Sequence, residues 1–165
     1  MVIGAANLVS EDFGHTITRE DTLPSENIQI HYLDGATKMS QTERGDWIDC
    51  YAYETIKLKA GDFALINLGF SCKLPNGYEA HLVPRSSTFK HWGLIQTNST
   101  GVIDQSYCGQ DDVWRMPVYA TRDTTINAGD RPCQFRIEQK MPKINFNDVD
   151  NLNGENRGGF GSSGK

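Results

Sequence analysis

Apolar and polar residues alternate over short stretches along most of the chain, and turn-forming residues separate one stretch from the next. The stretches are rich in β-branched and aromatic residues: NIQIHYL, WIDCYAY, TIKL, DFALINLGFSCKL, YEAHLVP, GLIQT, VWRMPVYAT and CQFRIE. The turn signals lie at residues 34–35, 60–62, 75–77, 98–101 and 127–130. Short strands at this spacing predict an all-β sandwich or barrel.

Two local signals refine this pattern. Pro75-Asn76-Gly77-Tyr78 stands between two of the strand-like stretches, and an Asn-Gly pair in that position predicts a β-hairpin. Residues 86–91 are the one segment with helical character, and they are barely long enough for a single turn.

The two ends of the chain lack the strand-like pattern. Residues 1–25 show no periodicity and are interpreted as an N-terminal extension, while residues 26–141 form the predicted barrel domain. Residues 142–165 are rich in Asn and Gly and cannot bury enough apolar surface to fold alone. We therefore expect a flexible C-terminal arm that orders only against a ligand or a neighbouring subunit. Its last residues resemble a phosphate-binding loop with no helix behind it.

Composition limits the classes of function. The 165 residues carry a net charge of −5, which argues against non-specific nucleic-acid binding because that needs a basic face. No apolar run is long enough for a membrane span, and the N-terminus lacks the features of a signal peptide. Four widely spaced cysteines, at positions 50, 72, 108 and 133, are expected to be reduced thiols in a cytoplasmic protein.

The segment VPRSSTFKHWG carries groups suited to phosphate. Arg85 supplies a planar set of donors, and the hydroxyls and amides of Ser86 and Ser87 follow at a strand-to-helix turn. The alternative is a serine helix cap beside an exposed arginine.

The segment NSTGVIDQSYCG is interpreted as a hairpin turn followed by a strand that presents Asp104 and Tyr107. A hairpin can read a base through its backbone, Asp104 can accept a proton from water, and Tyr107 has an apolar face for a sugar. The alternative is a strand-end aspartate in an Asx-turn and a core tyrosine.

Two further segments contain polar residues beside apolar strands. In AGDRPCQF a turn precedes Gln134, and the conservative interpretation is a surface pair between Asp130 and Arg131. In GDWIDCYA, Asp49 lies inside an apolar strand and needs a partner, either an arginine or a metal ion.

Taken in order, IDCYA, PRSS, GVIDQSY, GDRPCQF and GGFGSSG resemble the five motifs of the trimeric dUTPase family. The spellings GDWID, GYEAHLVPRSSTFK and GDRPCQFRI are most similar to the branch found in Gram-positive bacteria and their phages. The resemblance covers residues 26–165. It implies a jelly-roll-like β-barrel, a homotrimer with active sites shared between subunits, and Mg²⁺-assisted hydrolysis of dUTP to dUMP and pyrophosphate, which limits uracil incorporation into DNA.

The resemblance also implies roles for individual residues. Asp104 orients the water that attacks the α-phosphate, and Tyr107 lies under the deoxyribose. Asp49 lies near the water shell of the metal. The uracil-reading segment comprises Asn98, Gly101, Val102 and Ile103. The phosphate-side groups are Arg85, Ser86, Ser87 and Gln134 from a second subunit, and the arm of a third subunit contributes Arg157, Phe160, Gly161, Ser162 and Ser163.

The chain departs from the family pattern in several places. Glu155 stands where the arm usually has arginine, Trp47 replaces a glycine before Asp49, and Ser106 replaces the aspartate before Tyr107. Trp114 follows the third motif and is a rival to Phe160 as the aromatic group over the base. Three alternatives remain at this point: a dCTP deaminase of the same fold, a regulator that binds a repressor protein, and a nucleotide-binding module without turnover.

Overall fold

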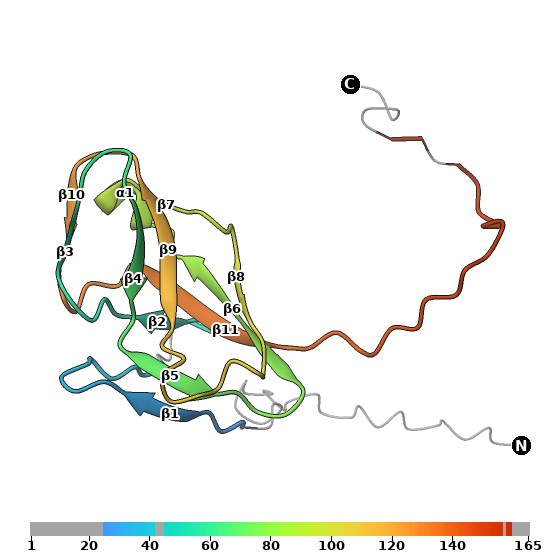
Figure 1. Cartoon of the computed structure of the whole chain (residues 1–165), viewed down its shortest axis with the longest axis horizontal. Coiled ribbons are helices and arrows are strands. Elements are labelled where there is room, and N and C mark those ends of the chain that lie inside the picture. The colour runs from blue at the N-terminus through green and yellow to red at the C-terminus, as the bar shows by residue number, and fades with distance from the viewer. Residues whose placement is uncertain (1–24, 42–44, 157, 160–165) are drawn as a thin grey trace, which may run out of the picture.

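The computed structural model describes residues 25–41, 45–156 and 158–159, and within them the chain forms eleven strands and one short helix (Figure 1). The expectation of an all-β protein is confirmed. The strands are β1 (Gln29–Tyr32), β2 (Ile48–Cys50), β3 (Ile56–Leu58), β4 (Phe63–Asn67), β5 (Phe70–Lys73), β6 (Tyr78–Pro84), β7 (Leu94–Gln96), β8 (Gly101–Ile103), β9 (Arg115–Ala120), β10 (Thr124–Ile126) and β11 (Cys133–Gln139). The helix is α1 (Thr88–Trp92).

The strands pair into small antiparallel sheets that wrap around one core. A four-stranded sheet has the order β2-β11-β6-β8, and a three-stranded sheet has the order β4-β9-β7. The other two sheets in the described residues are two-stranded, β1-β5 and β10-β3. Neighbours in these sheets are mostly far apart in sequence, as in a jelly roll, so the fold depends on long-range pairing.

The alternation seen in the sequence matches the burial of the strands. In β9, Met116, Val118 and Ala120 point into the core and are buried, while Arg115, before them, and Tyr119, between the last two, are exposed. The core centres on Trp114, whose ring lies 5.0 Å from Phe70 and 5.1 Å from Phe135, measured between centroids. All three aromatic rings are almost fully buried.

The expected hairpin at residues 75–78 is wrong. The turn itself is present, since Gly77 has φ +86° and the Tyr78 N–H donates to the Pro75 carbonyl at 3.3 Å. However, β5 pairs with β1, and β6 pairs with β11 and β8, so the turn carries the chain from one sheet to another. A local turn signal identifies a change of direction and does not identify the partner of the next strand.

Three other expectations are adjusted by the structure. The long stretch at residues 62–74 is two strands, β4 and β5, separated at Gly69, which has φ +75° and packs closely against Tyr53. The short helix begins two residues later than expected, at Thr88, whose buried hydroxyl donates to the Pro132 carbonyl at 2.7 Å. The three-residue strand β10 is not among the predicted stretches.

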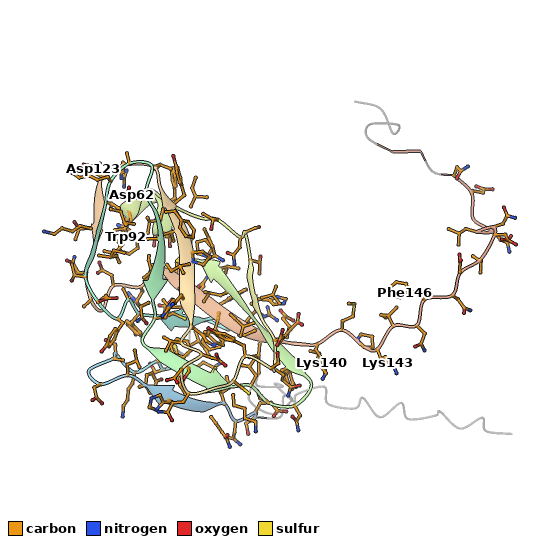
Figure 2. All side chains as sticks on the ribbon, viewed as in Figure 1. Asp62, Trp92, Asp123, Lys140, Lys143 and Phe146 are labelled. Carbon is orange, nitrogen blue, oxygen red and sulfur yellow. The ribbon has the colours of Figure 1, made fainter. Side chains whose placement is uncertain are left out.

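The C-terminal segment leaves the barrel after β11. Residues 141–156 contain no helix or strand, and every one of them is exposed. Figure 1 shows this segment running away from the barrel, and Figure 2 shows Lys143 and Phe146 along it. The expectation that the arm orders only against a ligand or a neighbouring subunit stays a prediction. Residues 1–24 lie outside the described residues, so the proposed division into an extension, a barrel and an arm stays a prediction.

All four cysteines lie in the described residues and are free thiols, as expected. Cys50 and Cys133 face each other across β2 and β11, and burial, together with the neighbouring thiol of Cys133, raises the pKa of Cys50 well above its ordinary value. No helix in the described residues is long and apolar enough to cross a membrane.

Candidate active site

One cleft of about 440 Å³ brings together most of the residues of the third motif. Its walls come from the end of β8 and the loop that follows it, and from β4, β6 and the start of β9. The lining includes Asn98, Gly101, Val102, Ile103, Asp104, Tyr107, Leu65, Leu82, Val113, Trp114, Arg115 and Pro117. The sequence therefore predicted correctly that Asn98, residues 101–103, Asp104 and Tyr107 share one place.

Asp104 stands directly after β8 in an Asx-turn. The Ser106 backbone N–H donates to Asp104 Oδ1 at 2.9 Å, and the Ser106 hydroxyl donates to the same oxygen. These two bonds, with the side-chain bond the larger cause, hold the pKa of Asp104 below its ordinary value. The Asx-turn that sequence analysis raised as an alternative is thus present, and it leaves Asp104 exposed and ionised at the edge of the cleft.

The sequence suggested one strand that carries both Asp104 and Tyr107, and this is wrong, because neither residue lies on a strand. β8 ends at Ile103, and the Tyr107 N–H donates to the Asp104 carbonyl at 3.2 Å, so both residues belong to one tight turn. The ring is 43% exposed and is no part of the core. The turn places Asp104 and Tyr107 in the lining of one cleft.

The amide of Asn98 is held by a buried neighbour. Gln96, at the end of β7, donates from Nε2 to the Leu82 carbonyl at 3.0 Å and to Asn98 Oδ1 at 2.9 Å. The next residue, Ser99, has φ +61°, and the segment then enters β8. Because β7 pairs with β9 and β8 pairs with β6, the connection between them crosses from one sheet to another and is not the hairpin that the sequence suggested.

A second group of polar residues lies where β2, β11 and β6 meet. Arg85 Nε contacts Asp49 Oδ1 at 2.8 Å, and Arg131 Nη1 contacts Asp49 Oδ2 at 3.0 Å. Gln134 lies opposite Asp49 in the β2–β11 register. Both carboxylate oxygens of Asp49 therefore face arginines, which confirms the expected link from this aspartate to an arginine.

Arg131 is a site residue that sequence analysis missed. The expected surface pair with Asp130 is wrong, because Asp130 instead accepts the Asn127 N–H at 2.8 Å within its own turn. The partner of Arg131 is Asp49, which lies 82 residues earlier in the chain. The sequence signal was Asp49 itself, an aspartate inside an apolar strand. It indicated an arginine partner but did not identify which arginine.

Ser86 and Ser87 lie between β6 and α1, next to Arg85. Ser87 stands at the N-terminal boundary of α1, but its side chain makes no capping hydrogen bond. The alternative of a serine helix cap is therefore not supported.

The two groups of residues are not in the same place within one chain. In the β6–β8 register Ala80 lies opposite Ile103, so Asp104 lies near Glu79 at the start of β6. Arg85 follows the other end of β6, six residues further on. At about 3.3 Å per residue this separates Asp104 from Arg85 by roughly 20 Å along the strand. Within one chain, the Asp104 cleft and the group around Arg85 therefore lie at opposite ends of β6 and do not meet.

Trp114 is not a candidate for the aromatic group over the base. Its side chain is 1% exposed and packs between Phe70 and Phe135, so it lies under the floor of the cleft. The rival residue, Phe160, lies outside the described residues, as do Arg157, Gly161, Ser162 and Ser163. Gly158, which is described, has φ +71°, a backbone conformation that side chains other than glycine rarely adopt.

The described residues do not form a magnesium site of their own. No three carboxylate, imidazole or thiol groups converge within the described part of the chain. Asp49 already contacts an arginine with each of its oxygens, so a cation bound directly there would lie beside two guanidinium groups that repel it. Magnesium commonly binds phosphate oxygens and water in nucleotide enzymes, and that mode needs no cluster of protein ligands.

Comparison with known proteins agrees with these features. A family model described as dUTPase matches residues 39–164. The SPbeta prophage-derived deoxyuridine 5′-triphosphate nucleotidohydrolase of Bacillus subtilis is 54% identical over 138 residues, which is 83% of this chain and 97% of that protein. The deoxyuridine 5′-triphosphate nucleotidohydrolase of Finegoldia magna is 36% identical over 118 residues, covering 69% of this chain and 80% of that protein.

Solved structures show the same fold. A Staphylococcus bacteriophage 80alpha dUTPase with dUpNHpp superposes with a TM-score of 0.71 at 20% identity, covering 85% of this chain and 99% of that one. The dUTPase of Streptococcus mutans superposes with a TM-score of 0.64 at 20% identity, covering 71% of this chain and 99% of that one. A mutant dUTPase from phage phi11 of S. aureus, with a TM-score of 0.67 at 18% identity over 77% of this chain and 99% of that one, coordinates a structural Mg(II) ion.

Proposed function

The chain belongs to the dUTPase family and hydrolyses dUTP to dUMP and pyrophosphate, and we propose that it does so in active sites that three copies of the chain build together. The family and the activity favour this enzyme over a dCTP deaminase or a binding module without turnover. The proposed setting is the cytoplasm, where the enzyme keeps uracil out of DNA, and the free thiols agree with that setting.

The separation of the two polar groups carries the proposal. A dUTP molecule needs its base and sugar in one pocket and its three phosphates beside cationic groups. Here the carboxylate and tyrosine lie at one end of β6, and the arginines lie at the other end. A second copy that brings its Arg85 to the Asp104 cleft supplies the missing half.

Exposed apolar side chains support contact between copies. On the three-stranded sheet, Phe63 lies opposite Tyr119, and Tyr119 lies opposite Ile95. These three residues are exposed, and so are Leu65 and Val102, which line the nucleoside cleft. A patch of this kind on a globular chain is typical of a surface that another chain covers. The homotrimer is therefore proposed to bury this face and close the cleft wall at the same time.

Within the cleft, Asp104 is proposed as the catalytic base. Its exposed, ionised carboxylate accepts a proton from the water that attacks the α-phosphate, a role worth about 10²–10⁴ in rate. Tyr107 places its ring under the deoxyribose and leaves no room for a 2′-hydroxyl. Asn98 and the backbone of residues 101–103 read the uracil.

The phosphate half is proposed to consist of Arg85, Ser86, Ser87 and Gln134 from the second subunit. Hydrolysis of a phosphate ester depends mainly on positioning and on neutralising charge, which these donors supply. The glycine-rich end of a third chain closes over the nucleotide, with Phe160 on the base. Its Ser162 and Ser163, with Gly161 and Arg157, contact the phosphates. These arm residues lie outside the described part of the chain, and their roles stay predictions.

Magnesium is proposed to arrive with the triphosphate, as part of the substrate. Its ligands are then phosphate oxygens and water, in agreement with the lack of a ligand cluster among the described residues. A contact from Asp49 to the water shell of the metal stays a prediction. The two ion pairs of Asp49 favour a structural role for this carboxylate.

The shared site is tested by mixing two inactive proteins. One is Asp104→Asn with an intact arm, and the other lacks residues 156–165 but keeps Asp104. The two proteins are unfolded together and reassembled in equal amounts. Random assembly into trimers then gives about one quarter of the sites both an intact Asp104 and an intact arm. Pyrophosphate release from dUTP should return to roughly that fraction of wild type. If exchange is confirmed by mass and activity stays at the level of the parents, each arm closes over its own chain and the proposal is wrong.

A regulatory role is a second candidate. A dUTPase of Staphylococcus bacteriophage 80alpha belongs to phage dUTPases that control transfer of virulence genes by a proto-oncogenic G protein-like mechanism. The relative from B. subtilis is prophage-derived, so binding of a repressor protein is a reasonable prediction for this chain as well. It is tested by pull-down with and without a dUTP analogue, where no specific protein in either condition would count against it.

A further inference from the structure

We propose, on the basis of the role given above to Asn98, that Gln96 is a specificity-positioning residue. It fixes the Asn98 carboxamide so that the amino group, and not the oxygen, is presented to the nucleobase. Gln96 does not line the cleft and is 6% exposed. Its influence on the substrate therefore passes through its neighbour.

The orientation of the Gln96 side-chain amide is set by a backbone carbonyl, which can only accept a hydrogen bond. The Leu82 carbonyl on β6 can only accept a hydrogen bond, and a Gln96 amide atom lies 3.0 Å from it. That atom must therefore be the donor Nε2. A reversed amide would put two acceptors in contact inside the protein.

The orientation of Asn98 follows from the same nitrogen. Gln96 Nε2 also lies 2.9 Å from the Asn98 side chain, and a donor there requires the acceptor Oδ1 on Asn98. The amino group Nδ2 then lies on the other side, toward Gly101. A Cβ built on Gly101 would lie 3.5 Å from Nδ2, which places the amino group beside the backbone of Gly101, a residue that lines the cleft.

The arrangement carries a cost that indicates selection for orientation. Gln96 Oε1 is buried and has no hydrogen-bond partner among the described residues. An unpaired buried acceptor is unfavourable, and an apolar side chain of similar size would avoid it. A glutamine at this position is explained if the two hydrogen bonds that it donates hold Asn98 in the orientation that the site needs.

A donor at this place distinguishes two pyrimidines. The 4-position of uracil carries a carbonyl oxygen that accepts, whereas that of cytosine carries an amino group that donates. An Asn98 amino group directed at the 4-position pairs with uracil and opposes cytosine. A carboxamide free to rotate would accommodate both bases, so the fixed orientation is what rejects dCTP.

The test compares Gln96→Met with wild type on dUTP and dCTP. Methionine keeps the length and removes the donor. We expect the ratio of kcat/KM for dUTP to that for dCTP to fall about tenfold or more, with most of the loss in KM for dUTP. Calorimetry with the imido analogues of the two nucleotides should show the same narrowing of the binding ratio. An unchanged ratio would overturn the proposal.

Two controls separate orientation from general damage. Thr88→Val removes another buried side-chain bond, the one to the Pro132 carbonyl, and should lower stability without changing the ratio. In an Asn98→Ala background, Gln96→Met should have no further effect on the ratio, because Gln96 acts through Asn98. A ratio that falls equally in both backgrounds would show that Gln96 acts otherwise.

A measurement on the wild-type protein does not depend on any variant folding. The side-chain amide resonance of Asn98 should shift when the dUTP analogue binds, and shift less with the dCTP analogue, while that of Gln96 stays protected from exchange. An unprotected Gln96 amide would contradict the fixed orientation. If wild type fails to hydrolyse dUTP, the proposed function itself is wrong; if it hydrolyses dUTP but Gln96→Met keeps the ratio, only the role of Gln96 is lost.

Discussion

The hydroxyl of Ser106 donates to Oδ1 of Asp104, and the backbone N–H of Ser106 donates to the same oxygen. The dUTPase family usually has an aspartate where this chain has Ser106. A serine adds a donor, whereas a second carboxylate would repel the first. The chain thus stabilises the ionised form of its proposed base by a residue two positions away.

The pH dependence of turnover tests this relationship. Ser106→Ala removes the largest cause of the lowered pKa of Asp104, so that pKa should rise toward its ordinary value. A base must be ionised to act, and activity is lost as pH falls through its pKa. The acidic limb of the kcat/KM profile should therefore move to higher pH in Ser106→Ala and return in Ser106→Thr. If the acidic limb does not move in Ser106→Ala, Asp104 is not the group whose protonation lowers kcat/KM.

Sugar selection is tested at Tyr107. Tyr107→Ala removes the ring that is proposed to exclude a 2′-hydroxyl, so the ratio of kcat/KM for dUTP to that for UTP should narrow. Tyr107→Phe is the matched control, because the hydroxyl makes only a long bond of 3.4 Å to the Val113 carbonyl. It should keep the ratio. Equal ratios in wild type and Tyr107→Ala would assign sugar selection to another residue.

The link between the first and second motifs is tested at Asp49. Asp49→Asn leaves Arg85 and Arg131 without their shared anion, and we expect a loss of about 1–3 kcal/mol in the free energy of unfolding. KM for dUTP should rise because Arg85 loses its anchor. Glu138→Gln breaks the more exposed pair with Arg136 and should change stability by less than about 1 kcal/mol. Urea unfolding and steady-state kinetics measure both effects, and equal stability losses would show that burial of the Asp49 pairs is unimportant.

Trp114 is expected to act on stability and not as a cover for the base. Trp114→Ala removes the centre of the aromatic core and should cost about 3–5 kcal/mol in unfolding free energy. Phe146→Ala, at a side chain that is 95% exposed, is the control and should leave the stability of the barrel unchanged. If Trp114→Ala keeps its stability but binds the nucleotide weakly, Trp114 is the aromatic group over the base after all.

Sequence patterns predicted the class of the fold and several of the residues that line the Asp104 cleft, because both depend on local order along the chain. The alternation in β9 and the sequence GVIDQSY each encode their structure within a few residues. Asp104 and Tyr107 share a tight turn, so their proximity follows from spacing alone, although the expected strand that would carry both is wrong.

Pairing between distant segments could not be predicted in the same way. The turn at Gly77 is encoded locally, but the choice of β11 as the partner of β6 depends on residues about 50 to 60 positions away. The same limit applies to Arg131, whose charge suggested its neighbour Asp130 while its actual partner is Asp49. Trp114 follows a motif and was therefore considered for the site, whereas packing against Phe70 and Phe135 places it in the core.

The position of β11 has a consequence for biosynthesis. It is the last strand in the described part of the chain, yet it lies inside the four-stranded sheet, with β2 on one side and β6 on the other. When a ribosome has released β2 and β6, the edges that will receive β11 are still unpaired, and such edges are prone to associate with other chains. The four-stranded sheet can close only after residue 139 has emerged, so until then the nascent chain carries unpaired strand edges that chaperones are expected to protect.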